Sequence, residues 1–229
     1  MSEVVLALDL PSREDALALL DGIPEVGWVK VGSVLMAQSG PTLLEELVGR
    51  GLQVFLDLKW HDIPNTVAGA VAAAAKLGVA MATVHTLGGR AMMAAAEQAA
   101  PQELSLVGVT VLTSHTAKSY AGTVGRDDVV LDDEVRRLAA LGRASGLSGV
   151  VCSPREIEVV RPALADDALI VTPGIRRPGD APGDQARMAT PAAAAAAGAT
   201  HLVVGRPVLQ APDPRTVFQE IAEEARCVG

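Results

Sequence analysis

Aromatic side chains are scarce in this sequence. They make up 2% of the 229 residues, whereas hydrophobic residues make up 49%, so the core must be built from Ala, Val and Leu. Proteins that bind single-stranded nucleic acid stack bases on aromatic side chains. Basic residues are in deficit as well, because the formal net charge at pH 7 is -8 and no basic patch is visible. We therefore expect no nucleic-acid partner, and any bound anion must be small and held locally.

Cysteine is nearly absent too. The two cysteines, Cys152 and Cys227, lie far apart and form no CxxC pattern, which is typical of reduced thiols in a cytoplasmic protein. The opening MSEVVLALDLPSRED has acids on both sides of a short apolar run, so it resembles neither a signal peptide nor a membrane span. None of the four histidines has metal-ligand spacing. We expect a cytoplasmic protein with no membrane partner and no metal site.

Short apolar runs alternate with helix-like segments along the whole chain. The runs typical of buried parallel strands are 4–10, 28–32, 80–85, 104–112, 149–152, 168–172 and 201–205. One more run, the third in chain order, begins at residue 53 and ends in the charges that start at residue 57. The helix-like segments are 12–20, 41–50, 65–77, 90–100, 132–145, 154–161, 191–197 and 213–226. Eight such pairs predict an α/β fold, a (β/α)8 TIM barrel, with residues 1–229 as a single domain.

The main alternative to the barrel is an open, doubly wound sheet. Such sheets usually carry a glycine-rich turn after the first strand, but here that turn is LDLPSRED, which has no glycine. Two connections, 113–130 and 174–188, are longer than the others. Connections of that length are usually functional lids or simply disordered, and we expect both to be loops.

The segment QVFLDLKWHDIPNTV is the most informative part of the sequence. Its apolar run ends in Asp57 and Lys59, and Asp62 follows in the turn before Pro64. In an extended strand, side chains at i and i+2 share a face, which predicts that Asp57 and Lys59 lie together. Burying such charges costs several kcal/mol per ion unless they pair closely. A reactive site explains the cluster better than a structural ion pair sealing the end of a strand.

Other polar residues stand at the ends of the predicted strands. In a barrel these ends form one mouth, where the active site lies. The expected ring of polar groups is Asp9, Lys30, Asp57, Lys59, His85, Thr113, Arg176 and Arg206. Barrels often hold a phosphate after strands seven and eight. The backbone N–H groups of Gly205 and Arg206, at the start of a short helical turn, can cradle an anion, and Arg206 adds a bidentate guanidinium.

The ordered motifs of the chain resemble those of one enzyme family. They are LALDL, WVKVG, DLKWHDIPNT, TVH, VTVLTS, TPGIR and VVGRP, and they span the whole sequence. Together they resemble the bacterial type of the orotidine 5'-monophosphate decarboxylase family. The resemblance implies a barrel that forms a homodimer and converts orotidine 5'-monophosphate to UMP and CO2 in de novo pyrimidine biosynthesis, with no cofactor.

The same resemblance implies roles for individual residues. Lys59 would deliver a proton to C6 of the pyrimidine, with Asp57 beside the departing carboxylate, and Asp62 and Thr66 would come from the other subunit. The implied catalytic residues are Lys59, Asp57, Asp62 and Lys30. The implied substrate-binding residues are Asp9 and Lys30 at the ribose, Asp57, Ile63, Thr66, Thr113 or its neighbour Ser114 at the base, and Arg176, Gln185, Gly205 and Arg206 at the phosphate. Gln185 would reach across from a lid, the connection 174–188.

Elementary chemistry favours the same residues. Loss of CO2 from C6 leaves a lone pair in the ring plane, which a fixed ammonium stabilises before it donates its proton. Carboxylates beside Lys59 favour its charged form, whereas a lysine that forms a Schiff base must be neutral. Two alternatives stay open. One is a metal-dependent enzyme of sugar phosphates on the same barrel, disfavoured by the IPNT, LTS and PGIR segments. The other is a non-catalytic UMP sensor, disfavoured by Lys59.

Overall fold

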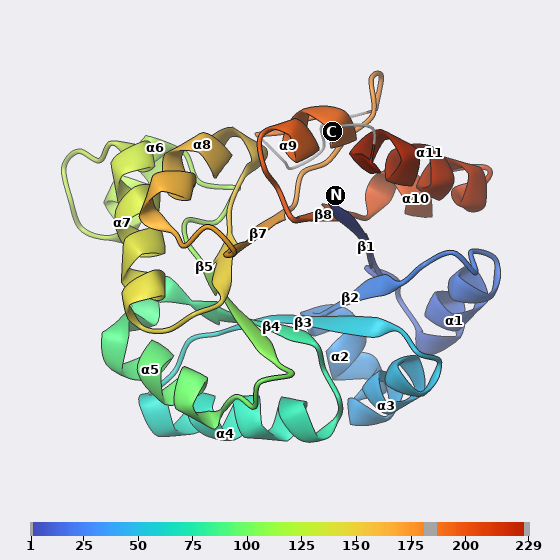
Figure 1. Cartoon of the computed structure of the whole chain (residues 1–229), viewed down its shortest axis with the longest axis horizontal. Coiled ribbons are helices and arrows are strands. Elements are labelled where there is room, and N and C mark those ends of the chain that lie inside the picture. The colour runs from blue at the N-terminus through green and yellow to red at the C-terminus, as the bar shows by residue number, and fades with distance from the viewer. Residues whose placement is uncertain (1, 181–186, 227–229) are drawn as a thin grey trace.

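The computed structural model describes residues 2–180 and 187–226. Within these residues eight parallel strands close into a barrel in the order β1 to β8, and the helices lie around it (Figure 1). Each strand pairs with the next along the chain, and β8 pairs with β1, so no strand is left at an edge. The predicted (β/α)8 barrel is confirmed.

The elements begin and end within a few residues of most predicted bounds. The strands are β1 (Glu3–Ala7), β2 (Trp28–Gly32), β3 (Gln53–Trp60), β4 (Met81–His85), β5 (Ser105–Val109), β6 (Gly149–Val151), β7 (Leu169–Thr172) and β8 (His201–Val204). The longer helices are α1 (Arg13–Asp21), α3 (Pro41–Gly49), α4 (Pro64–Lys76), α5 (Gly89–Ala99), α7 (Leu131–Ala144) and α11 (Pro214–Arg226). The shorter ones are α2 (Ser33–Ser39), α6 (Ala117–Thr123), α8 (Ile157–Val160), α9 (Pro191–Ala196) and α10 (Arg206–Leu209), and three 3-10 turns are η1 (Thr86–Gly88), η2 (Pro154–Glu156) and η3 (Arg161–Ala163).

Two predicted helix starts have the expected caps. The Ser12 hydroxyl accepts from the Asp15 N–H at 3.1 Å, and the Thr190 hydroxyl accepts from the Ala193 N–H at 3.2 Å. Each side chain thereby satisfies a backbone donor that the helix itself leaves unpaired. None of the helices in the described ranges is long and apolar enough to cross a membrane.

Three segments differ from the predicted pattern. Helix α2 was not predicted, and α6 lies inside the connection 113–130 that was expected to be a loop. Helix α6 begins with a capping box in which Thr116 and Ser119 bond each other's backbone, a serine variant of the usual Glu or Gln signature. The predicted helix at 154–161 consists of η2, α8 and the start of η3, and Pro162 in η3 prevents α8 from continuing.

Two apolar clusters hold the barrel together, because alternate strand residues face inward and outward. The interior cluster is Val5, Ala7, Phe55, Met81, Val107, Val171 and Val203, and a larger cluster fills the space between strands and helices. At the amino ends of the strands, Trp28 packs edge-on against His201 with ring centroids 5.0 Å apart. Burial lowers the pKa of His201 to about 4, so this residue is neutral at pH 7. The interior below the mouth is therefore filled and apolar.

Candidate active site

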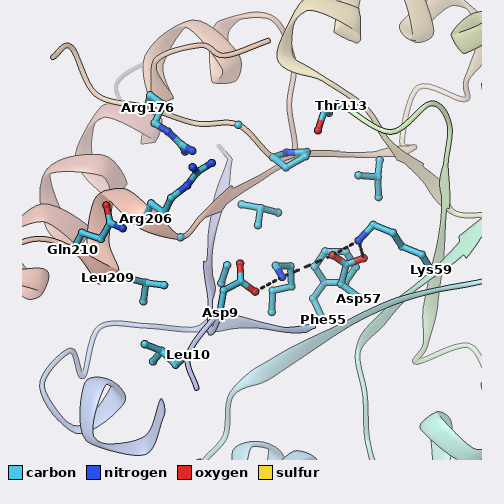
Figure 2. A pocket seen from close by; sticks show the side chains of 17 residues that line it. Asp9, Leu10, Phe55, Asp57, Lys59, Thr113, Arg176, Arg206, Leu209 and Gln210 are labelled. Atoms are coloured by element: carbon cyan, nitrogen blue, oxygen red, sulfur yellow. Dashed lines mark hydrogen bonds and ion pairs between the residues drawn. The ribbon is translucent and has the colours of Figure 1, made fainter. Parts of the chain in front are cut away.

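A pocket of about 490 Å³ lies at the carboxyl ends of the strands (Figure 2). Its lining comprises Ala7, Asp9, Leu10, Lys30, Phe55, Asp57, Lys59, Thr113, Val151, Pro173, Gly174, Arg176, Val203, Gly205, Arg206, Leu209 and Gln210. The pocket brings together residues from seven of the β strands or the segments that follow them, all but β4, so strands distant in sequence contribute to one site. Its size lies within the range of small-molecule sites, which typically enclose about 300–1,000 Å³.

His85 is the exception among the ring of polar groups predicted at the mouth, because it does not line the pocket. Its Nδ1 accepts from the Leu87 N–H at 3.4 Å, and its ring stacks on His61 with centroids 5.4 Å apart. Burial is the main cause that lowers its pKa to about 4, with smaller contributions from His61 and Lys59. His85 thus acts as a neutral residue that caps η1.

Four side chains of alternating sign form what we term the charged row: Asp9, Lys30, Asp57 and Lys59. The Lys30 ammonium lies 2.9 Å from Asp9 Oδ1 and 3.8 Å from Asp57 Oδ2. The Lys59 ammonium lies 2.8 Å from each carboxylate oxygen of Asp57. The Lys30 and Asp57 side chains are only 11% and 13% exposed, so their mutual attraction must offset a substantial desolvation cost. The outer members, Asp9 and Lys59, reach the solvent side of the pocket.

The backbone at Lys59 departs from a regular strand. Its φ of 51° is the one positive φ at a non-glycine residue in ranges 2–180 and 187–226. Asp57 and Lys59 meet as predicted, but the extended geometry assumed for the prediction is wrong at Lys59. A left-handed conformation at such a residue costs about 1–2 kcal/mol. Strain of this kind is often concentrated at functional residues, where the surrounding structure maintains it.

The opposite side of the pocket is cationic, and we term Arg176, Gly205 and Arg206 the arginine end. Arg176 follows β7 and is buried, with its Nη1 donating to the Ile175 carbonyl oxygen at 2.7 Å. Gly205 caps α10, and Arg206 is the first residue of that helix, as predicted. The guanidinium groups of Arg176 and Arg206 both turn into the pocket (Figure 2). An anionic group of a ligand would be bound here.

Several pocket residues were not predicted from the sequence. Phe55 and Leu10 form part of the apolar wall, and Leu209 and Gln210 come from the end of α10. Gln210 stands four residues after Arg206, the spacing that places two side chains on one helix face, so this signal could have found it. Phe55 could not be distinguished from an ordinary core residue, because it also belongs to the interior cluster.

Other predicted site residues lie away from the pocket of their own chain. Asp62, Ile63 and Thr66 are exposed where β3 leads into α4, and Ile63 is 67% exposed. Asp62 Oδ1 accepts from the Ile63 N–H at 2.6 Å. Thr113 lines the pocket, whereas its neighbour Ser114 does not. Gln185 lies outside the described residues.

A second hollow of about 460 Å³ adjoins the first. It shares all four side chains of the charged row and extends along the start of α2 to Val34, which is 65% exposed. The charged row therefore forms a wall between two open spaces. In the ranges that the structure describes, no group of three or more His, Cys, Asp or Glu side chains is placed to hold a metal ion. Cys152 is a buried thiol whose pKa is raised to about 12 by burial, and Cys227 lies outside those ranges.

Comparison with known proteins assigns the family. The family model described as Orotidine 5'-phosphate decarboxylase / HUMPS family matches residues 2–221. Orotidine 5'-phosphate decarboxylase of Halorhodospira halophila is 50% identical over 99% of this chain and 97% of its own length, and that of Alkalilimnicola ehrlichii is 50% identical over 97% and 96%. The crystal structure of orotidine 5'-phosphate decarboxylase from Lactobacillus acidophilus superposes with a TM-score of 0.88 at 35% identity, covering 99% of this chain and all of that one. The chain therefore belongs to the orotidine 5'-phosphate decarboxylase / HUMPS family.

Proposed function

We propose that this enzyme decarboxylates orotidine 5'-phosphate to UMP and CO2 in pyrimidine biosynthesis, without a cofactor and with Lys59 as the proton donor to C6. The relatives reported above carry this activity in their names. The observation that carries the mechanism is the Lys59 ammonium, held 2.8 Å from both oxygens of Asp57 inside a nucleotide-sized pocket. The pathway is one of the cytoplasm, and we propose that location for the protein.

The pocket offers a separate place for each part of the substrate. The arginine end matches the 5'-phosphate, because guanidinium groups bind phosphate oxygens in a bidentate manner. Asp9 and Lys30 offer an acceptor and a donor to the ribose hydroxyls, and we assign the base to the part of the pocket that Thr113 lines. In this orientation C6 of the pyrimidine faces Lys59. The orotate carboxylate then lies beside Asp57.

The reaction needs one bond to break and one to form. The bond between C6 and the carboxylate breaks, CO2 leaves, and the electron pair stays on C6 in the ring plane. The fixed Lys59 ammonium stabilises this developing charge, because a preorganised cation in a partly desolvated site acts more strongly than one in water. A proton then moves from Lys59 Nζ to C6 and yields UMP. The neutral amine regains its proton from water once the product has left.

We further propose that a homodimer completes the site, with Asp62 and Thr66 of each chain reaching the charged row of the other. Asp62 and Thr66 are exposed and do not line the pocket of their own chain. The second hollow gives access to Asp57 and Lys59 from outside the main pocket. An exposed apolar side chain lies near each place: Val34 beside the second hollow and Ile63 beside Asp62. Such side chains are suited to burial between two copies of the chain.

The test is the loss of orotidine 5'-phosphate absorbance on addition of the purified protein in the presence of EDTA. We expect rapid conversion to UMP by the wild type and a loss of at least about 10⁴-fold in kcat for Lys59→Ala, which removes both the electrostatic contribution and the proton donor. Lys76→Ala is the matched control, since Lys76 is an exposed lysine at the end of α4. Full activity of Lys59→Ala would refute the mechanism. Tight UMP binding without turnover would favour a sensor, and turnover of sugar phosphates with Mg²⁺ would favour the other enzyme.

A further inference from the structure

A single residue of β4, Thr83, lies opposite the irregular part of β3. Leu56 pairs with Ala82 and Trp60 pairs with Val84, so the three residues from Asp57 to Lys59 all fall opposite Thr83. A bulge of this kind leaves backbone groups without their regular ladder partners. The residue opposite it must satisfy those groups in another way.

The Thr83 hydroxyl does so with both of its hydrogen-bonding functions. Its Oγ1 accepts from the Lys59 backbone N–H at 2.7 Å and donates to Asp57 Oδ1 at 3.1 Å. A hydroxyl carries one proton, so acceptance from the backbone directs that proton to the carboxylate. Thr83 has no exposed surface and does not line the pocket. It therefore contacts both catalytic residues without reaching the substrate.

We propose that Thr83 is a positioning residue of the catalytic site: its hydroxyl holds the left-handed backbone turn at Lys59 and orients the Asp57 carboxylate toward the Lys59 ammonium. The inference rests on the proposed function, in which that ammonium must meet C6. Asp57 Oδ1, which accepts the Thr83 proton, also lies 2.8 Å from Lys59 Nζ. One hydroxyl thus constrains the backbone from which the lysine projects and the carboxylate against which its ammonium rests. Displacement of a reacting group by about 1 Å can cost about 100-fold in rate.

The variants that test this are Thr83→Val, which keeps the shape and removes the hydroxyl, and Thr83→Ser, which keeps the hydroxyl. Thr86→Val is the matched control, because Thr86 is equally buried and donates to the Val109 carbonyl oxygen at 2.8 Å, away from the charged row. For Thr83→Val we expect kcat to fall about 10- to 100-fold with KM within about 3-fold of the wild type. Thr83→Ser and Thr86→Val should stay within about 3-fold in both constants. If Thr83→Val does not fold, Thr83→Cys, which replaces the hydroxyl with a thiol that is a much weaker hydrogen-bonding group, should show the same loss.

A binding measurement separates positioning from a general loss of structure. UMP reports the phosphate and ribose contacts, whereas a UMP analogue with an anionic oxygen on C6 also reports the place of the Lys59 ammonium. Thr83→Val should bind the analogue at least about 10-fold more weakly and UMP within about 3-fold of the wild type. Equal weakening of both ligands, an unchanged kcat in Thr83→Val, or an equal loss in Thr86→Val would each overturn the inference. A wild type that does not turn over orotidine 5'-phosphate would instead refute the proposed function itself.

Discussion

The charged row and the arginine end lie in one pocket but are built differently. The row rises from three adjacent strands, β1 to β3, whose register is fixed by parallel pairing, with Asp9 two residues after the end of β1. The arginine end follows β7 and β8, in the connection to α9 and in the short helix α10. The row alternates in sign, with contacts of 2.8 to 3.8 Å between neighbours, whereas the other end presents two guanidinium groups to the ligand.

This difference corresponds to two tasks. At C6 the ammonium must be placed accurately, and side chains on strands are held more accurately than side chains on loops. At the phosphate the task is to supply binding energy far from the reacting atom, which a connection can do. The comparison predicts that substitutions in the charged row and in the arginine end change different kinetic properties. The first should impair the reaction itself, and the second should impair binding of the phosphate.

Within the arginine end, the largest loss of activity is expected at Arg206. Arg206→Ala should lower kcat/KM for orotidine 5'-phosphate about 100-fold, because a charge-assisted contact to phosphate is lost. The same variant should turn over the phosphate-free nucleoside orotidine at the wild-type rate, whereas Lys59→Ala should fail with both substrates. Arg136→Ala, at an exposed arginine of α7, serves as the control. An equal loss with orotidine would mean that Arg206 acts on the reacting centre, and the division between the two ends would be wrong.

The second test asks whether Asp62 of one chain completes the charged row of another chain. Lys59→Ala and Asp62→Ala should each be nearly inactive alone. In a hybrid dimer one site contains both mutations, but the other combines an intact Lys59 with the intact Asp62 of the partner. An equal mixture that exchanges subunits should therefore recover about a quarter of the wild-type activity.

The control for this experiment is a mixture of Lys59→Ala with Asp57→Ala. Both of these residues belong to the same chain's pocket, so every hybrid site carries a defect and no activity should return. Recovery in the control would mean that Asp57 and Lys59 from different chains can share a site. No recovery in the first mixture, once subunit exchange is shown by mass spectrometry, would place Asp62 in its own chain's site. The charged row would then be complete within a single chain.

Much of the reacting centre could be predicted from sequence, since charges that interrupt apolar runs are conspicuous and the carboxyl ends of barrel strands converge. The bulge at Lys59 could not be predicted, because it depends on how β3 pairs with β4 and leaves no residue pattern in the sequence of either strand. Thr83 was missed for a related reason: in TVH it reads as an ordinary β-branched strand residue. All three residues of the arginine end were predicted from the sequence. The neighbouring Gln210, which also lines the pocket, was overlooked.

A buried ion pair beyond the pocket was equally invisible in the sequence. Glu156 is 1% exposed, pairs with Arg187 across 31 residues of sequence and accepts from the Ser153 N–H at 2.8 Å. Arg187 also donates to the Leu112 carbonyl oxygen at 3.4 Å, just before Thr113. The pair thus ties the chain that returns from β7 to the segments after β5 and β6. From outside the pocket, the pair therefore stabilises the connection after β7, which also carries Arg176 of the arginine end.

The smallest catalytic effect is therefore expected from Glu156→Gln. Its neutral amide leaves the largely buried Arg187 guanidinium without its directly paired carboxylate, which should lower the free energy of unfolding by about 3 kcal/mol. Because neither residue lines the pocket, kcat/KM of the folded protein should fall less than about 10-fold. Urea unfolding measures the first quantity, with exposed Glu158→Gln as a control expected within about 0.5 kcal/mol of the wild type. If Glu156→Gln instead lost as much activity as Arg206→Ala, the arginine end would require placement as accurate as that of the charged row, and the contrast between the two ends would disappear.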